Sequence, residues 1–323
     1  MLAAMADTAF GARRLGNAAS VLEKMVRDPE CWTVLTLSGA MTVAKMGLVI
    51  CEMIERGYVQ AIISTGALMT HGLVESQGRH HYKYDASMDD AALYEAGYNR
   101  VYDTLEPESN LDEAEGVVRA VLDGLPDDEI LSSHRLTQAI GQYLLEHNPN
   151  GRGPLISAAR HGVPIFIPAL TDSEMGLDMA VDNHRRIQQG RAARSYDPFI
   201  DLDHYARLVE GAERLGIFTI GGGVPRNYAQ QVGPYLEIRH HRTGMPLRKP
   251  ARFRYGVRIC PDSEHIGGLS GCTYQEGVSW GKFVPESRGG HFAEVLADAT
   301  MVWPLVVKAV TERVPRKAAC CDE

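Results

Sequence analysis

One lysine stands between a tryptophan and a phenylalanine in the segment EGVSWGKF, residues 276–283. A lysine ammonium that is shielded from water has a lowered pKa, and the neutral amine that results can attack a carbonyl or imine carbon. Glu276, six residues before Lys282, could orient that amine or carry protons. A lysine in this setting can equally lie along an aromatic surface with its charge in water. The residues alone leave both interpretations of Lys282 open.

Four segments rich in small residues follow predicted strands: SGAMT (38–42), STGAL (64–68), ALTDSE (169–174) and GGGVPRN (221–227). In open α/β sheets, ligands bind beyond the carboxyl ends of the strands. Small residues let a ligand approach the backbone there, and the start of the next helix favours a phosphate. Any one segment is typical of a tight turn, and none matches GxGxxG. The four together favour a nucleotide or a similar cofactor.

Histidines raise the question of a metal. His80-His81 and His240-His241 are adjacent pairs, whose side chains diverge in a strand, and the chain has no HExxH. Because ligand spacing of the usual kind is missing, the sequence predicts solvated surface histidines and no metal site.

Composition limits the class of protein. The chain has 323 residues, 45% hydrophobic and 23% charged, with a net charge of -8. This is typical of a globular protein with a large core and disfavours nucleic acid as a partner. The six cysteines form no CxxC motif, the N-terminus does not resemble a signal peptide, and no segment reaches the roughly 20 apolar residues of a membrane span. We therefore expect reduced cysteines, a cytoplasmic location and no membrane partner.

The elements that must position these residues alternate along the chain. Residues 32–38 and 59–64 are predicted strands on either side of a predicted helix, 41–56, and such a βαβ unit predicts a parallel sheet. The other predicted strands are 164–170, 217–220, 252–259 and 292–297, and the other predicted helices are 133–147, 155–161, 201–216 and 300–313. The fold class is therefore α/β.

The predicted organisation is one main domain, 31–314, with an N-terminal helical extension, 1–30, and a mobile tail, 315–323. Residues 77–110, rich in His, Tyr and Asp, interrupt the alternation and are predicted to be an insertion.

Several motifs together resemble the deoxyhypusine synthase family. They are SGCTYQEGVSWGKF (270–283), LADAT (296–300), PALTDSEMGLD (168–178) and the GGGV loop, and the resemblance extends from about residue 30 to about 313. It implies a Rossmann-like fold, mostly a parallel sheet with helices on both faces, that binds NAD. It also implies a homotetramer with active sites at a dimer interface.

The resemblance further implies the reaction. In that family NAD takes a hydride from a polyamine, the aminobutyl group passes to a lysine as an imine, and the group then moves to an acceptor amine and is reduced. The acceptor is a protein lysine in deoxyhypusine synthase and putrescine in the related homospermidine synthases. Three alternatives stay open: a homospermidine synthase-like or other small-amine transferase, an oxidoreductase that releases its product to water, and a non-catalytic NAD-binding homologue.

By motif, the resemblance assigns Lys282 as the covalent nucleophile, with Glu276 and Trp280 shaping the amine pocket and Asp178 holding a substrate ammonium. Residues expected to line the NAD site are Ser38, Thr42, Thr65, Gly66, Asp172, Gly222, Asp298 and Ala299.

The chain departs from the family at groups that would hold a polycation. It has Thr70-His71 where the eukaryotic enzymes have an acidic pair, Asn227 where they have a histidine, and Leu269 where they have an acid. We place His71 and Asn227 in the substrate site all the same. Unless Glu75, Asp262 or Glu264 compensates, these departures have two open interpretations: a different amine substrate or acceptor, or the same pocket rearranged by local shifts. Arg226 and His71 would suit a substrate with a carboxylate or fewer charges.

Overall fold

The computed structural model describes residues 1–316, and its contacts group the chain into two compact units. Unit 1 contains residues 1–39, 52–64 and 198 onward, and unit 2 contains residues 40–51 and 65–197. The predicted boundaries at 30/31 and 314/315 stay predictions, and residues 317–323 of the predicted tail lie outside the described part of the chain.

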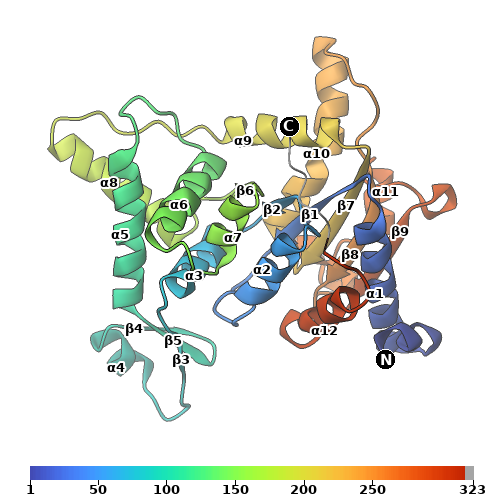
Figure 1. Cartoon of the computed structure of the whole chain (residues 1–323), viewed down its shortest axis with the longest axis horizontal. Coiled ribbons are helices and arrows are strands. Elements are labelled where there is room, and N and C mark those ends of the chain that lie inside the picture. The colour runs from blue at the N-terminus through green and yellow to red at the C-terminus, as the bar shows by residue number, and fades with distance from the viewer. Residues whose placement is uncertain (317–323) are drawn as a thin grey trace. The chain divides into compact units, whose positions relative to one another are not determined.

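Unit 1 is built on parallel strands (Figure 1). Five of its strands run side by side in the order β2-β1-β7-β8-β9, and every pair among them is parallel. Their bounds are Cys31–Leu37 (β1), Ala61–Ile63 (β2), Arg214–Ile220 (β7), Phe253–Ile259 (β8) and His291–Val295 (β9). The central strands are almost continuously buried, as expected for strands covered by helices on both faces. The predicted α/β fold with a parallel sheet is confirmed.

Helices of unit 1 cover this sheet. α1 (Phe10–Arg27) and α12 (Ala299–Thr311) contact each other and β8, whereas α10 (Gly223–Thr243) contacts α9 (Pro198–Gly211), β1 and β2. The predicted N-terminal helix is confirmed as α1, which follows a short 3-10 helix, Leu2–Asp7. One face of α1 is fully buried, so the helix contributes directly to the core.

Unit 2 is mainly helical. Its helices are α3 (Gly66–Ser76), α4 (Asp90–Glu95), α5 (Glu108–Gly124), α6 (Ser133–His147), α7 (Pro154–Arg160) and α8 (Glu174–Gln188). The predicted insertion forms a small antiparallel sheet in the order β3 (Tyr82–Lys83), β5 (Thr104–Pro107), β4 (Tyr98–Val101). The strand predicted at 164–170 is only Ile165–Phe166 (β6).

Two predicted helices have different bounds in the structure. The helix predicted over 201–216 ends at Gly211, because Arg214 already pairs with Cys31 as the first residue of β7. The helix predicted over 41–56 is α2, Gly47–Glu55, which begins after a turn in which Lys45 has φ +64. Strand pairing sets the end of the first helix and turn geometry sets the start of the second, although the apolar spacing of the sequence continues past both points.

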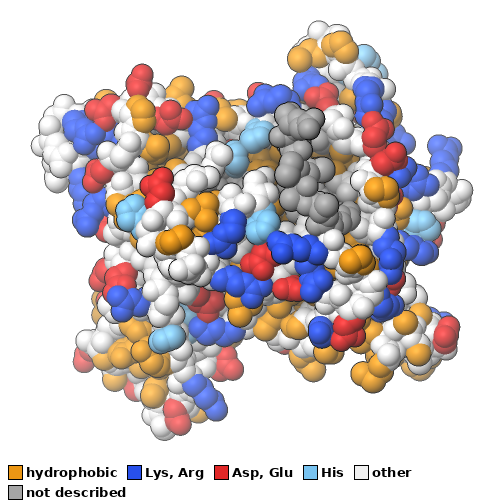
Figure 2. Space-filling model, in the orientation of Figure 1, with side chains coloured by type: hydrophobic (Ala, Val, Ile, Leu, Met, Phe, Trp, Pro, Cys, Tyr) orange, Lys and Arg blue, Asp and Glu red, His pale blue; other side chains and the backbone are white. Residues whose placement is uncertain are grey.

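The visible surface carries mixed charge. In Figure 2 acidic and basic side chains are interspersed over the face shown. Within residues 1–316, no helix combines the length and the apolar character that crossing a bilayer requires.

Candidate functional site

The backbone of Lys282 is held firmly at the start of β8. Its N–H donates to Gly277 O (3.1 Å), and its carbonyl accepts from Phe253 N (2.9 Å). Gly281 makes the preceding turn with φ +71, a conformation that favours glycine. The next residue, Phe283, is 1% exposed and packs edge-on against other aromatic rings. The lysine therefore projects from a rigid, aromatic base.

The side chain of Lys282 is half-buried in a pocket of about 200 Å³. The pocket is lined by residues of α10, of the segment 269–273, and of α11 (Tyr274–Ser279) with the residues that follow it. Lys282 Nζ donates to Asn227 Oδ1 (3.1 Å) and lies 5.9 Å from the centre of the Trp280 ring. Trp280 itself is 65% exposed, so it forms the rim of the pocket. Lys282, Asn227, Trp280 and Glu276 are thus brought together.

The electrostatics destabilise the charged form of the Lys282 amine. Burial lowers the pKa of Lys282, and the Arg226 guanidinium lowers it further, while Glu276 has a weaker, opposite effect. Arg226 is 3% exposed, donates from Nη1 to Cys272 O (2.7 Å) and stacks over the Tyr274 ring at 5.3 Å. A buried guanidinium fixed behind a lysine disfavours a second positive charge there. This arrangement supports the reactive interpretation of Lys282.

Among the described residues that line this pocket, Glu276 is the one carboxylate. The acids considered as compensating groups lie elsewhere. Asp262 accepts the hydroxyl hydrogen of Ser270, Glu264 lines a different cavity, and Glu75 pairs with a lysine in unit 2. The family's acidic groups that this sequence lacks are therefore not replaced by another acid in this pocket.

The loop between β7 and α10 has the form of an anion cradle. Gly221 has φ +77, and Gly222 N donates to Ser38 Oγ (2.9 Å). A Cβ at Gly222 would lie 2.6 Å from the Cα of Ser270, so the position requires glycine. Within the described chain, no side chain caps α10, which begins at Gly223. Its first N–H groups are available to a phosphate.

The other predicted cofactor residues of unit 1 follow β9. Asp298 caps α12 by accepting from Thr300 N (2.8 Å), and Ala299 is buried at the first helical position. In this structure the side chain of Asp298 therefore acts as a helix cap.

The predicted cofactor residues of unit 2 also have structural partners. Thr65 caps α3 through Leu68 N (3.3 Å), and Thr42 Oγ1 donates to Leu68 O (2.7 Å). Gly66 lies so close to Ser173 that a Cβ would approach its hydroxyl to 2.1 Å. The cap of α8 is Ser173, and Asp172 is exposed.

Asp178 lies on α8 among other acids. Burial, followed by the charges of Glu115 and Glu174, raises its pKa to about 6. Crowded carboxylates of this kind bind a cation readily, because the cation relieves their repulsion.

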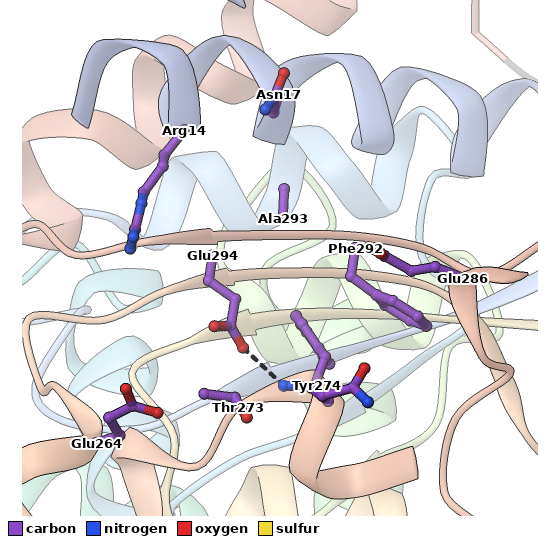
Figure 3. Close-up of a pocket in the computed structure, with 10 residues that line it drawn as sticks. Arg14, Asn17, Glu264, Thr273, Tyr274, Glu286, Phe292, Ala293 and Glu294 are labelled. Carbon is purple, nitrogen blue, oxygen red and sulfur yellow. Dashed lines mark hydrogen bonds between the residues drawn. The ribbon is translucent and has the colours of Figure 1, made fainter. Parts of the chain in front are cut away.

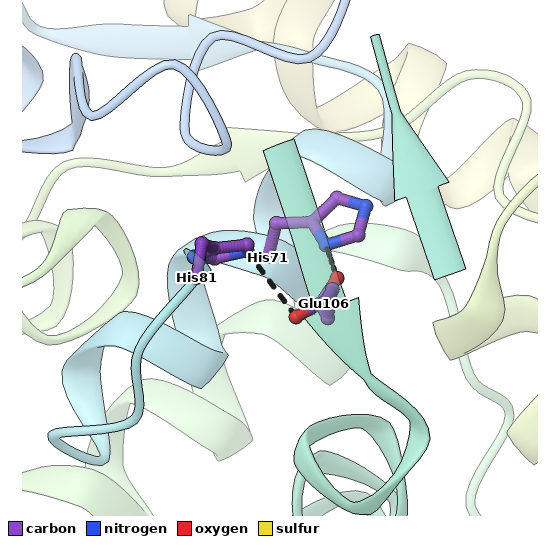
Figure 4. Close-up of side chains that lie close together, drawn as sticks. All are labelled: His71, His81 and Glu106. Atoms are coloured by element: carbon purple, nitrogen blue, oxygen red, sulfur yellow. Dashed lines mark ion pairs between the residues drawn. The ribbon is translucent and has the colours of Figure 1, made fainter. Parts of the chain in front are cut away.

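His71 is engaged within unit 2. Its Nδ1 lies 2.6 Å from Glu106 Oε2, and His81 Nε2 lies 3.2 Å from Glu106 Oε1 (Figure 4). Burial alone would raise the pKa of Glu106, but the two histidines lower it to about 2. The surface placement predicted for His81 is wrong: its side chain is 0% exposed, because β3 turns it inward. Glu106 lies in no motif and was missed.

A larger cavity, of about 560 Å³, lies between α1, α11 and β9 (Figure 3). Its lining includes Arg14, Glu264, Glu286 and Glu294, and the carboxylate of Glu294 accepts from Tyr274 N (2.9 Å). It does not contain Lys282.

Comparisons with known proteins agree with one another. The sequence profile of the family "Deoxyhypusine synthase" matches residues 1–310. "Probable deoxyhypusine synthase 2" of Methanosarcina acetivorans is 32% identical over 309 residues, 96% of this chain and 85% of the relative. "Probable deoxyhypusine synthase 1" of Methanosarcina mazei is 33% identical and covers 97% and 90%. "Deoxyhypusine synthase-like protein" of Chlorobaculum parvum is 32% identical and covers 95% and 84%.

A solved structure from Entamoeba histolytica that bears the same family name superposes with a TM-score of 0.63 at 15% identity, covering 98% of this chain and 93% of the other. At that identity the superposition supports the fold alone.

Proposed function

Because the chain belongs to the deoxyhypusine synthase family, we propose that it is an NAD-dependent transferase that moves an aminobutyl group from a polyamine to an acceptor amine through an imine on Lys282. The observation that carries the proposal is the half-buried Lys282, whose pKa is lowered by burial and by Arg226 inside a pocket.

Lys282 acts first as a nucleophile and then as a leaving group. As a neutral amine it attacks the carbon of the donor imine, forms a new C=N bond and expels the donor's other half as a free amine, which takes up the two hydrogens that Lys282 loses. An acceptor amine then attacks the same carbon, and Lys282 regains its two hydrogens. Asn227 Oδ1, 3.1 Å from Nζ, directs the amine before attack. Glu276, at the pocket, is the group available to move protons between the amines.

The residues fit the expected cofactor. When bound, NAD would take a hydride from the donor carbon and return it to the final imine. The glycines at 221–223, the uncapped start of α10 and Ser38 would hold its phosphates on unit 1, with Asp298 and Ala299 next to the end of β9. Thr42, Thr65, Gly66 and Asp172 are the candidates on unit 2.

The acceptor follows the family: a lysine of a protein. Asp178 is proposed to hold an ammonium of the substrate, because its carboxylate lies among other acids. We further propose a homotetramer acting in the cytoplasm. Leu177 and Val181, one turn apart on α8, are exposed apolar residues that suit a subunit contact, and the four described cysteines are free thiols.

A second candidate is transfer with an amine of fewer charges or with a carboxylate. The Lys282 pocket contains two basic side chains, Arg226 and Lys282, and one carboxylate, Glu276. The guanidinium of Arg226 lies at the wall of the pocket and would attract a substrate carboxylate.

The test is to incubate the full chain with NAD and, in turn, spermidine, putrescine, agmatine and an amino-acid-derived amine, and then to add borohydride. Mass spectrometry of the peptide that contains Lys282 should show an aminobutyl adduct, and NADH should accumulate before an acceptor is added. A parallel incubation supplies a protein acceptor with an exposed lysine.

Lys282→Arg is the matched control, because it keeps a long basic side chain and removes the nucleophilic amine; it should abolish the adduct and leave NAD binding intact. An adduct that forms only with the carboxylate-bearing amine would favour the second candidate. If NAD binds but no amine yields an adduct or NADH, the chain is a non-catalytic homologue and the proposal fails.

A further inference from the structure

Three ligand-type side chains converge in unit 2, and the reaction proposed above uses none of their contacts. They are His71, His81 and Glu106, whose candidate ligand atoms all lie within 4.8 Å of one another (Figure 4). All three side chains are at least nine-tenths buried, at 9%, 0% and 1% exposed.

Separate elements position the three side chains. His71 is on α3, Glu106 is on β5, and His81 immediately precedes β3. Tyr82 pairs with Leu105 in the antiparallel register, so the next step of that register sets His81 opposite Glu106, on one face of the small sheet. The α3 helix supplies His71 to the same face. The cluster therefore depends on the insertion, residues 77–110, folding back on α3.

The polar atoms in this cluster lack adequate partners. His71 Nδ1, His81 Nε2 and Glu106 Oε1 are buried, and none of them forms a hydrogen bond of acceptable angle with any described residue. Their short separations, 2.6 Å and 3.2 Å, place them around a common centre instead. Leaving buried polar atoms unsatisfied is costly, and an ion at that centre would satisfy all three at once.

We propose that His71, His81 and Glu106 bind a divalent transition-metal ion, with zinc the favoured ion. Two imidazoles and one carboxylate are the donor set of open zinc sites, in which water takes the fourth position. Ligands about 2.0 Å from a tetrahedral zinc ion stand about 3.3 Å apart, so the atoms need to move by only an ångström or so. The ion would fasten the insertion to α3.

Glu75 and Lys45 form the surroundings of the site. Lys45 Nζ lies 3.0 Å from His81 Nδ1 and 2.5 Å from Glu75 Oε1, and Glu75 Oε1 lies 3.8 Å from His81 Nδ1. Binding of the ion to Nε2 leaves a hydrogen on Nδ1. Lys45 would then give up its contact with Nδ1, and the imidazole would donate this hydrogen to Glu75. A carboxylate that accepts from a ligating histidine strengthens the metal site, so Glu75→Gln should weaken metal binding by about 10-fold or more.

The experiment uses the full chain, stripped with a chelator and then titrated with Co²⁺ as a spectroscopic probe, with Zn²⁺ as competitor. We expect one Co²⁺ per chain, visible absorption of a four- or five-coordinate ion, and displacement by one equivalent of Zn²⁺. His81→Asn and Glu106→Gln should each weaken Co²⁺ binding by about 100-fold. His80→Asn is the matched control, because His80 is the exposed neighbour and should bind as tightly as the wild type.

A folded wild-type chain that takes up no Co²⁺ or Zn²⁺ would overturn the proposal, since the histidines would then only pair with Glu106. Equal affinity of the His80→Asn and His81→Asn variants would overturn it as well. The wild-type stoichiometry needs no variant, so a substitution that prevents folding still leaves a decisive result.

Discussion

The hydrogen bond from Lys282 Nζ to Asn227 Oδ1 offers a test of how the surroundings control the reactivity of the lysine. Asn227→Asp keeps the shape of the side chain and replaces the amide that accepts from Nζ at 3.1 Å with a carboxylate. A carboxylate at that distance favours the ammonium, so the pKa of Lys282 should rise again, against the lowering caused by burial and Arg226.

The size of the effect follows from the distance. An opposite charge within about 4–6 Å shifts a pKa by about 1–3 units. At a pH below the wild-type pKa of Lys282, such a shift lowers the fraction of neutral amine by about 10- to 1,000-fold. The solvent-exposed rim of the pocket screens part of this attraction, so we expect the lower half of the range. Asn227→Leu removes the acceptor without adding charge and should not reduce the neutral fraction.

The assay labels amines with formaldehyde and cyanoborohydride and measures the rate at the Lys282 peptide by mass spectrometry, from neutral to alkaline pH. The exposed Lys83 serves as internal reference. The Asn227→Asp variant should react slowly at neutral pH and approach the wild-type rate as the pH rises. Superimposable pH profiles for wild type and Asn227→Asp would refute the view that this contact controls the amine.

Three further predictions concern a glycine of the β7–α10 loop and two carboxylates, Asp178 and Asp28. Gly222→Ala should lower the free energy of unfolding, measured in urea, by about 1–3 kcal/mol, because its Cβ would lie 2.6 Å from the backbone of Ser270. The control is Gly116→Ala in α5, where a Cβ meets open space, and this substitution should stabilise the chain by up to about 1 kcal/mol. Equal effects of the two substitutions would contradict the explanation. The pKa of Asp178 is raised to about 6 from 3.8, so the folded state binds the proton more tightly and the wild type loses stability as the pH rises between those values. Asp178→Asn should therefore be more stable than the wild type at pH 7 and equal to it in thermal melts below pH 3.8, and a difference that persists at low pH would count against the assignment. Asp28 accepts hydrogen bonds from an arginine and a tyrosine, which lower its pKa, so Asp28→Asn should cost about 1.5–3 kcal/mol near neutral pH and progressively less in acid; a pH-independent cost would exclude the ionic explanation.

Local patterns predicted much of the fold. The strand at 32–38 and the helix at 300–313 agree with the structure to within about two residues at each end, because their apolar runs match the burial that the sheet and its covering helices provide. The prediction over 201–216 was wrong near its end, where apolar spacing continues but Arg214 enters the sheet beside Cys31. Spacing along the chain contains no information about that neighbour.

In the site, too, local sequence determined some features and tertiary structure the others. The sequence by itself identified the family and a lysine in aromatic surroundings, since these depend on residues that are adjacent in the chain. Only the tertiary structure decided that Asn227 accepts from Lys282, and that Glu106 lies between two histidines. Contacts of this kind depend on strand register and helix packing over long separations, and these place side chains next to one another that no local pattern connects.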